Sequence, residues 1–234
     1  VPQILCIQFE NLRSMNLPNM RIGKITSTSF SNCRKLEKLR IVGAYISSMD
    51  ADTFSHNEVL ENIEISGIEK LTLSEDVFDS LVNLKQLNLW FTQLTSESLP
   101  GGVFKSLKNL EVLRINNSPI TSVNPQWFEH LKNLKEAIFV GNLITALPEK
   151  LFINNPELVT VNFQENPLTT IASDAFKSLT KLEYFSLFRC KLSAIDPAWF
   201  EDLTNLGHLR LNDNKMQSIP ENAFTNLRNL NLLD

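Results

Sequence analysis

The chain has 234 residues, of which 43% are hydrophobic and 21% are charged, and its formal net charge is −4. These values are typical of one folded domain near the upper end of the usual size range. A mildly acidic chain without a basic block is a poor binder of nucleic acid or of an anionic membrane surface. No apolar run approaches the roughly 20 residues that a membrane-spanning helix needs. The three histidines and three cysteines lack zinc-finger spacing.

The first eleven residues precede any repeated pattern. They contain the apolar run Ile4-Leu5-Cys6-Ile7-Gln8-Phe9, which predicts a short strand. The chain begins at Val1 without a leader sequence, which is typical of a processed product or a fragment.

A repeated motif organises the rest of the chain. Leu-x-x-Leu-x-Leu recurs, followed by a polar or small residue, aliphatic residues and a phenylalanine. The coils begin at residues 12, 36, 60, 84, 110, 134, 158, 182, 206 and 230, so eight of nine intervals are 24 and one is 26. Nine of the fifteen phenylalanines share one position: Phe30, Phe54, Phe78, Phe104, Phe128, Phe152, Phe176, Phe200 and Phe224.

This pattern resembles the leucine-rich repeat family in its 24-residue form, L-x-x-L-x-L-x-x-N-x-L with a Phe on the outer side. The resemblance covers residues 12–234. It implies an α/β fold, a right-handed solenoid or horseshoe whose concave face is a parallel sheet with one short strand per coil. Loops and short helices would form the convex side. We therefore expect residues 1–11 to be a cap segment, and residues 12–234 to be a single solenoid of nine full repeats and the start of a tenth.

The physical chemistry of the repeat gives the same expectation. The last two leucines of the motif alternate as a strand requires and bury one face of it. No coil can bury its apolar face alone, but stacked coils form a continuous core, in which we expect the Phe positions to align as a spine. At Asn124-Pro125 and Asp196-Pro197 we expect short helices that carry Trp127 and Trp199 on the convex side.

The position after each strand is expected to carry a ladder of buried polar side chains. The chain turns sharply there, and an Asn amide can pair with backbone N–H and C=O groups of its own and the adjacent coil. Because the first three members are apolar, we expect a less regular N-terminal third. The position holds Met20, Ala44, Ile68, Thr92, Ser118, Asn142, Asn166, Cys190 and Asn214.

The cysteines have structural interpretations. Cys190 in the ladder is expected to be a buried, inert thiol. Cys6 lies in the cap segment and Cys33 in the first coil, so a disulfide between them would tie down the end where fraying is easiest. The alternative is two unpaired buried thiols. The four-cysteine cap common in secreted members of the family is missing, which weakens the argument from the family to secretion.

The outward positions of the inner sheet are the candidate binding surface. If positions are counted from the first Leu of each coil, the third, fifth, seventh and eighth residues face outward. Large apolar side chains and nearby arginines at these positions have the composition of an interaction hot spot. The alternative is that they fold over the rim or are ordinary apolar surface. The candidate residues are Trp90, Phe91, Arg114, Ile138, Val140, Tyr184, Phe188 and Arg189.

One N-glycosylation sequon is present, Asn116-Asn117-Ser118. It falls on the concave side in the middle of the candidate patch. A glycan on Asn116 would obstruct a flat partner, so the two hypotheses compete.

No sequence motif indicates catalysis. Phosphate-binding, Gly-x-Ser-x-Gly, His-Glu-x-x-His and calcium-loop motifs are absent. We therefore expect no enzyme, no cofactor and no metal. Phe-bearing repeats of this length look like those of animal secreted and cell-surface proteins, including Toll-type ectodomains and insect immune proteins.

The resemblance implies an extracellular recognition module that binds a protein or microbial ligand, in innate immunity or as a receptor. Adhesion or developmental signalling is the second hypothesis. A third is a structural or assembly subunit that oligomerises through its C-terminal edge or through Trp127 and Trp199, and an enzyme inhibitor is a fourth. Since the pattern stops at Asp234 early in a new coil, we expect a truncated solenoid.

Overall fold

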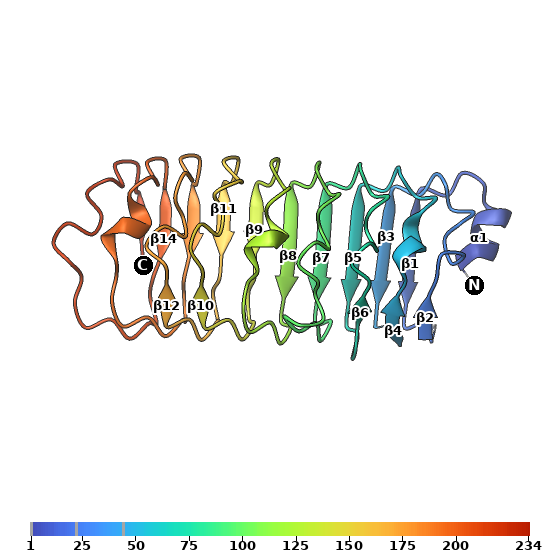
Figure 1. Cartoon of the computed structure of the whole chain (residues 1–234), viewed down its shortest axis with the longest axis horizontal. Helices are drawn as coiled ribbons and strands as arrows, with labels where there is room; N and C mark the ends of the chain where they lie inside the picture. Colours follow the sequence, from blue (N-terminus) through green and yellow to red (C-terminus); the bar gives the residue numbers. More distant parts are fainter. Residues whose placement is uncertain (1, 22, 44) are drawn as a thin grey trace.

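The computed structural model describes residues 2–21, 23–43 and 45–234, which form an elongated solenoid (Figure 1). A ten-stranded parallel sheet runs along its whole length, which confirms the predicted fold class. The strands, in spatial order, are β1 (Ser14–Pro18), β3 (Lys38–Val42), β5 (Asn62–Ser66), β7 (Gln86–Trp90), β8 (Val112–Asn116), β9 (Glu136–Ile138), β11 (Thr160–Asn162), β13 (Tyr184–Ser186), β14 (His208–Arg210) and β15 (Leu232–Leu233).

The register of this sheet follows the sequence period. Leu39 of β3 pairs with Ile63 of β5, one repeat later in the chain, and the same offset recurs along the sheet. Between β7 and β8 the offset is two residues longer, with Leu87 opposite Leu113. The two extra residues therefore lie outside the sheet, and the strand pairing continues without a slip.

The opposite side of the solenoid contains more regular structure than the sequence indicated. Two small parallel sheets lie there, in addition to the turns and 3-10 helices. The helices are η1 (Ala51–Phe54), η2 (Pro125–Trp127) and η3 (Pro197–Phe200), and the strands are β2 (Gly23–Ile25), β4 (Ile46–Met49) and β6 (Thr72–Leu73) in one sheet, β10 (Ala146–Leu147) and β12 (Thr170–Ile171) in the other.

Side-chain caps explain where two of these helices begin. Asn124 accepts a hydrogen bond from the backbone N–H of Gln126, and Asp196 accepts one from Ala198, each at 3.0 Å. Proline follows both caps at the first helical position, where no backbone N–H is needed.

The N-terminal segment is a helix, α1 (Pro2–Gln8), so the strand expected over residues 4–9 is wrong. A short apolar run does not distinguish a helix from a strand by itself. Here Cys6 is buried and joined to Cys33 by a disulfide, while Ile4 and Ile7 stay exposed. The disulfide holds α1 against the first coil at the end of the solenoid (Figure 1).

Aromatic rings stacked from coil to coil fill the core. Phe30, Phe54 and Phe78 stack with centroid separations of 5.7 and 6.2 Å. A second column, formed by Phe139 and Phe163 directly after β9 and β11, lies against the first in the C-terminal half. Of the nine repeat phenylalanines, all but the half-buried Phe224 are buried.

The ladder asparagines pair with the backbone of two coils. Asn166 donates to the carbonyls of Phe139 and Phe163 at 2.7 and 2.9 Å, and accepts from the N–H of Ile144 at 3.1 Å. Asn142 and Asn214 also donate to a carbonyl of the preceding coil and accept from one of its backbone N–H groups. In the N-terminal coils, Met20 is half-buried and Ile68 buried, while the ladder residue Ala44 lies outside the described residues.

A second set of buried amides was not expected. Asn57 and Asn155 occupy the position three residues after the repeat Phe, where most coils have Leu. Each donates two hydrogen bonds to carbonyls of the preceding coil, Asn155 to Phe128 and Leu131 at 3.0 and 2.8 Å. The polar pairing between coils therefore extends to the side opposite the main ladder.

Replacing Asn166 with Ala should lower the free energy of unfolding by about 2–4 kcal/mol, because two carbonyls and one N–H would lose their buried partner. Chemical denaturation measures the change. Asn133 provides the control, because its side chain is exposed and makes one bond to the Lys108 carbonyl. Asn133→Ala should cost less than about 1 kcal/mol. Equal losses in both variants would contradict the assigned role of the buried ladder.

Candidate binding face

The side chains predicted to bind lie on the concave face of the ten-stranded sheet or in the turns directly after its strands, and they form two groups. Trp90, Arg114 and Ile138 belong to the neighbouring strands β7, β8 and β9, with Phe91 and Val140 just beyond. The second group, Tyr184, Phe188 and Arg189, belongs to β13 and the turn after it. Since β13 is four strands from β7 and two from β9, Tyr184 is about 19 Å from Trp90 and about 10 Å from Ile138 along the sheet. The polar strand β11 separates Ile138 from Tyr184.

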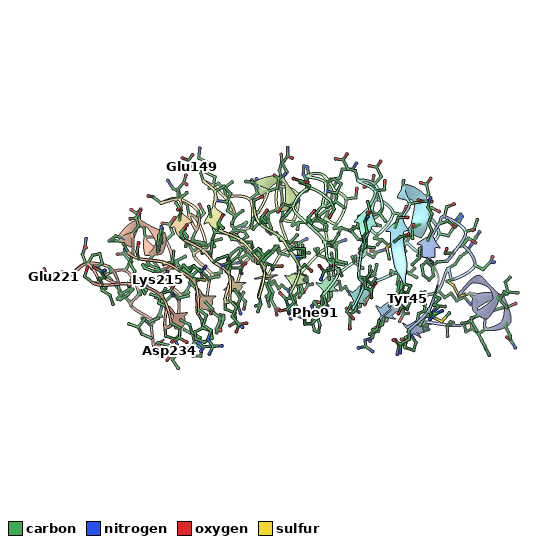
Figure 2. All side chains as sticks on the ribbon, turned by 90° about the horizontal axis from the view of Figure 1, so that it is seen from below. Tyr45, Phe91, Glu149, Lys215, Glu221 and Asp234 are labelled. Atoms are coloured by element: carbon green, nitrogen blue, oxygen red, sulfur yellow. A yellow bond between two sulfur atoms is a disulfide. The ribbon has the colours of Figure 1, made fainter. Side chains whose placement is uncertain are left out.

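The first group contains the most exposed aromatic side chain of the face. Phe91 is 56% exposed, whereas Trp90 is half-buried at the end of β7. Figure 2 shows Phe91 and Asp234 on the side of the ten-stranded sheet, with Glu149 on the opposite side. Arg114 is held in place, since its guanidinium pairs with Glu136 at 2.5 Å. Phe91 is thus available to a partner, while the charge of Arg114 is largely neutralised.

The eighth position of the coil has a left-handed backbone in all nine coils. Glycine adopts this conformation without strain, and Asn and Asp tolerate it, whereas for other residues it costs about 1–2 kcal/mol. Glu165 and Arg189 make an ion pair with each other at 3.7 Å. Phe91 has neither an aromatic nor a cation–π partner among the described residues. The position reads Asn19, Gly43, Gly67, Phe91, Asn117, Gly141, Glu165, Arg189 and Asp213.

Phe188 in the second group is covered by two guanidinium groups. Those of Arg189 and Arg210 both lie 4.8 Å from its ring centroid. Arg189 also pairs with Asp213 at 3.3 Å, and Arg210 with Asp234 at 3.1 Å. Hydrogen bonding to Tyr184 raises the pKa of Arg210 above its ordinary value. This cluster is a charged surface. Arg210 and Asp213 occupy outward positions but were not among the candidate binding residues, and Asp234 was not predicted.

Two exposed apolar side chains next to the patch were also missed. Tyr45 is 55% exposed, with the guanidinium of Arg21 at 5.5 Å from its ring, and Leu143 is 51% exposed. Both occupy the tenth position of their coils, beside the residues with left-handed backbone. The sequence could have predicted this exposure. The ladder residue takes the inward-facing position, so an apolar residue directly after it has no inward-facing position left.

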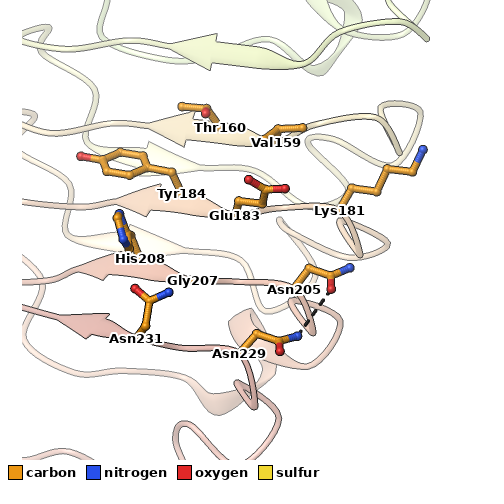
Figure 3. A pocket seen from close by; sticks show the side chains of 10 residues that line it. All are labelled: Val159, Thr160, Lys181, Glu183, Tyr184, Asn205, Gly207, His208, Asn229 and Asn231. Atoms are coloured by element: carbon orange, nitrogen blue, oxygen red, sulfur yellow. Dashed lines mark hydrogen bonds between the residues drawn. The ribbon is translucent and has the colours of Figure 1, made fainter.

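A polar groove of about 730 Å³ lies at the strand-start edge of β11, β13 and β14 (Figure 3). Tyr184 and His208 stand in adjacent strands with their rings 6.3 Å apart and roughly perpendicular. Glu183 and Gly207 precede them, and Asn231 lies on the next coil. Of the groove residues, only Tyr184 was a candidate binding residue, although His208 and Thr160 also occupy outward positions. The groove is completed by Val159, Thr160, Lys181, Asn205 and Asn229.

The sequon residue Asn116 lies between the aromatic and aliphatic parts of the first group. Its side-chain oxygen accepts a hydrogen bond from the N–H of Val140 at 2.9 Å, and it pairs in register with Trp90. A sugar on its amide nitrogen would rest on the face itself. Occupancy of this sequon stays a prediction.

Catalytic chemistry finds no support among the described residues. No group of three or more His, Cys, Asp and Glu side chains there could hold a metal ion. The Cys190 thiol is buried in the ladder, and burial raises its pKa to about 11. A thiol with such a pKa is a weak nucleophile at neutral pH, because the thiolate is the reactive form.

The convex tryptophans are not available to a partner. Trp127 is 1% exposed and Trp199 is 5% exposed, so the hypothesis that they pack against another chain is wrong. Each lies on a short helix that turns the indole into the core. At the C-terminal edge, in contrast, Ile219, Leu232 and Leu233 are exposed beside a hollow of about 440 Å³.

Comparison with known proteins shows to which family this architecture belongs. The BspA type Leucine rich repeat region matches in six copies over residues 6–99 and 97–231. The chain belongs to the leucine-rich repeat family. Chicken (Gallus gallus) Tsukushi is 30% identical over 115 residues, 49% of this chain and 31% of Tsukushi. Human (Homo sapiens) Toll-like receptor 5 is 29% identical over 145 residues, 61% of this chain and 16% of the receptor.

The leucine-rich repeat chain thus spans a third or less of these two relatives. Among solved structures, the octameric complex of Latrophilin 3, Unc5D and FLRT2 contains a similar chain, with a TM-score of 0.75 and 24% identity. The match covers 87% of this chain and 62% of that one. At this level of identity the similarity shows a common fold.

Replacing Phe91 with Gly should raise the free energy of unfolding of this leucine-rich repeat chain by about 0.5–1 kcal/mol, because it relieves the left-handed backbone. Thermal and denaturant unfolding measure the change. Gly67 supplies the reciprocal test, since its φ is +65° and an added Cβ would lie 3.2 Å from the Gly43 nitrogen. Gly67→Ala should be destabilising. A destabilised Phe91→Gly variant would show instead that the ring packs on its own chain.

Proposed function

We propose that the chain is a non-catalytic, extracellular protein-recognition module that binds its ligand on the concave face. The observation that carries the proposal is Phe91, an exposed aromatic side chain on strained backbone with Trp90 beside it. Strain of this kind clusters at functional sites, where the surrounding fold maintains it. Tyr45 and Leu143 extend the apolar surface along the same rim.

The relatives support a recognition role, and a receptor-type or innate-immune setting is the finer proposal. Toll-like receptor 5 is a receptor by name, and the FLRT2 repeat chain occurs in a complex with other proteins. A protein or microbial ligand is therefore favoured over nucleic acid, in keeping with the net charge of −4. Adhesion or developmental signalling would use the same face.

The disulfide between Cys6 and Cys33 favours an oxidising compartment, since such bonds are rare where thiols are kept reduced. No helix of the described residues is long and apolar enough to cross a bilayer.

An assembly role through the exposed C-terminal edge is the second candidate function, supported by Ile219, Leu232 and Leu233.

Intact mass of the protein purified from its source tests the extracellular proposal. Reduction should raise the mass by about two daltons, because each sulfur of the disulfide gains a hydrogen. Enzymatic deglycosylation reports separately on Asn116. Three free thiols and no glycan would place the chain in a reducing compartment and contradict the proposal.

A panel of purified extracellular protein domains, screened by biolayer interferometry, tests the binding face. For any binder, Trp90→Ala combined with Phe91→Asn should weaken affinity by about 100-fold or more, as expected for central aromatic anchors. Asn is used at position 91 because it tolerates the left-handed backbone. Glu149→Ala, on the opposite side (Figure 2), is the matched control and should bind normally. Binding that survives the double substitution would refute this assignment.

A further inference from the structure

A column of charged side chains marks the strand-start edge of the sheet. These residues occupy the second position, directly after the first Leu, of the first six coils and of the coil that begins at residue 182. Neighbours in the column form ion pairs from coil to coil: Arg13 with Glu37, Lys85 with Glu61 at 2.8 Å and Lys135 with Glu111 at 2.9 Å. Each pair joins equivalent positions of adjacent coils, so the period of the repeat brings opposite charges together. The glutamates at positions 37, 61 and 111 thus all have a cation in an adjacent coil.

Glu183 is the acidic residue at which this arrangement breaks. The equivalent residues of the coils before and after it are Val159 and Gly207, and neither can supply a charge. Its exposed carboxylate makes no ion pair or hydrogen bond among the described residues. Lys181, two residues away, is already engaged, because both carboxylate oxygens of Glu157 lie 2.6–2.7 Å from its nitrogen. The carboxylate of Glu183 is therefore open to an external cation.

Gly207 leaves the space in which such a cation would fit. Its backbone is outside the left-handed region, so the conformation does not require glycine. A Cβ there would meet only the amide nitrogen of Asn231 at 3.3 Å and the Glu183 carbonyl at 3.7 Å. In the paired coils the corresponding volume is occupied by a long side chain such as Lys85 or Lys135. Here it is the open floor of the polar groove in Figure 3.

The walls of the groove suit a positive, planar or extended group. Tyr184 and His208 border it on one side and present ring surfaces against which a cationic group can stack (Figure 3). The side chain of Asn231 borders it on another side and offers an amide oxygen as an acceptor. A volume of about 730 Å³ accommodates a whole arginine or lysine side chain.

We propose that this groove is a subsite for a basic side chain, arginine or lysine, of the protein partner. The incoming cation occupies the place of the missing charge at Gly207 and pairs with Glu183, so the partner completes the column of ion pairs. This inference rests on the proposed function, in that a protein ligand lies on the concave face. It assigns a contact at the start of β13, four strands away from β7 and Phe91.

N-acetyl-arginine amide is the probe, and the nearly isosteric, uncharged N-acetyl-citrulline amide is its control. Both are titrated into the ¹⁵N-labelled chain, and the shifts of the Gly207 and His208 amides are followed by NMR. The arginine probe should bind in the millimolar range, and the citrulline probe should bind at least 10-fold more weakly. Equal binding of the two probes, or no arginine binding up to 100 mM, would overturn the proposal.

Two variants test whether the arginine probe binds in the groove. Glu183→Gln removes the charge while keeping the shape, and should weaken the arginine probe at least 5-fold. Gly207→Lys supplies the missing cation from the chain itself and should do the same, since Asn231 can move aside. Glu149→Gln, on the opposite side of the solenoid, is the matched control and should leave the titration unchanged. Unaltered thermal unfolding of each variant verifies its fold. Undiminished binding to a folded Glu183→Gln variant would overturn the proposal.

Measurements with a protein partner separate this inference from the proposed function. If the partner binds Glu183→Gln and Gly207→Lys normally but loses affinity for the Trp90 and Phe91 variant, the groove inference fails and the proposed function stands. If all variants bind equally, both fail. Weakening by either groove variant, together with the arginine titration, supports the subsite.

Discussion

The stacking of successive coils in a constant register is the constraint on which the rest of this structure depends. A single coil has an apolar interior but no second layer against which to bury it, so its stability comes from the coils on either side. Parallel pairing at a fixed offset then aligns every position of the repeat with itself. Phenylalanines stack on phenylalanines, asparagine amides reach the carbonyls of the preceding coil, and opposite charges at the strand-start edge pair across the same distance.

The turn after each strand sets a second constraint, because it combines left-handed backbone with buried polar groups. Where the ladder holds Asn, the amide supplies both a donor and an acceptor, and the carbonyls of two coils are satisfied at once. The preceding position accepts Gly, Asn or Asp at little cost. Phe91 is the exception, with no aromatic or cation–π partner among the described residues, whereas Arg189 makes ion pairs with Glu165 and Asp213.

The binding sites proposed for this molecule lie where the repeat is broken. The leucines, phenylalanines and asparagines that match the pattern hold the solenoid together, and their surfaces are hidden. The residues that depart from it, such as Phe91 at a position suited to Gly and Gly207 at a position suited to a charge, alter the concave face. One departure adds an exposed ring and the other opens a groove, so two regions of the face offer different chemistry.

The sequence by itself determined the architecture, because one motif repeated through nine successive coils leaves one way to bury the leucines and phenylalanines. It also determined which side chains face outward, since side chains alternate along a strand. Only the tertiary structure decided what those side chains do. Arg114 and Phe188 are engaged by neighbours in adjacent coils, Trp127 and Trp199 turn inward, and residues 2–8 form a helix. Such outcomes depend on contacts between residues distant in the chain and on the packing of each ring, neither of which a one-dimensional pattern specifies.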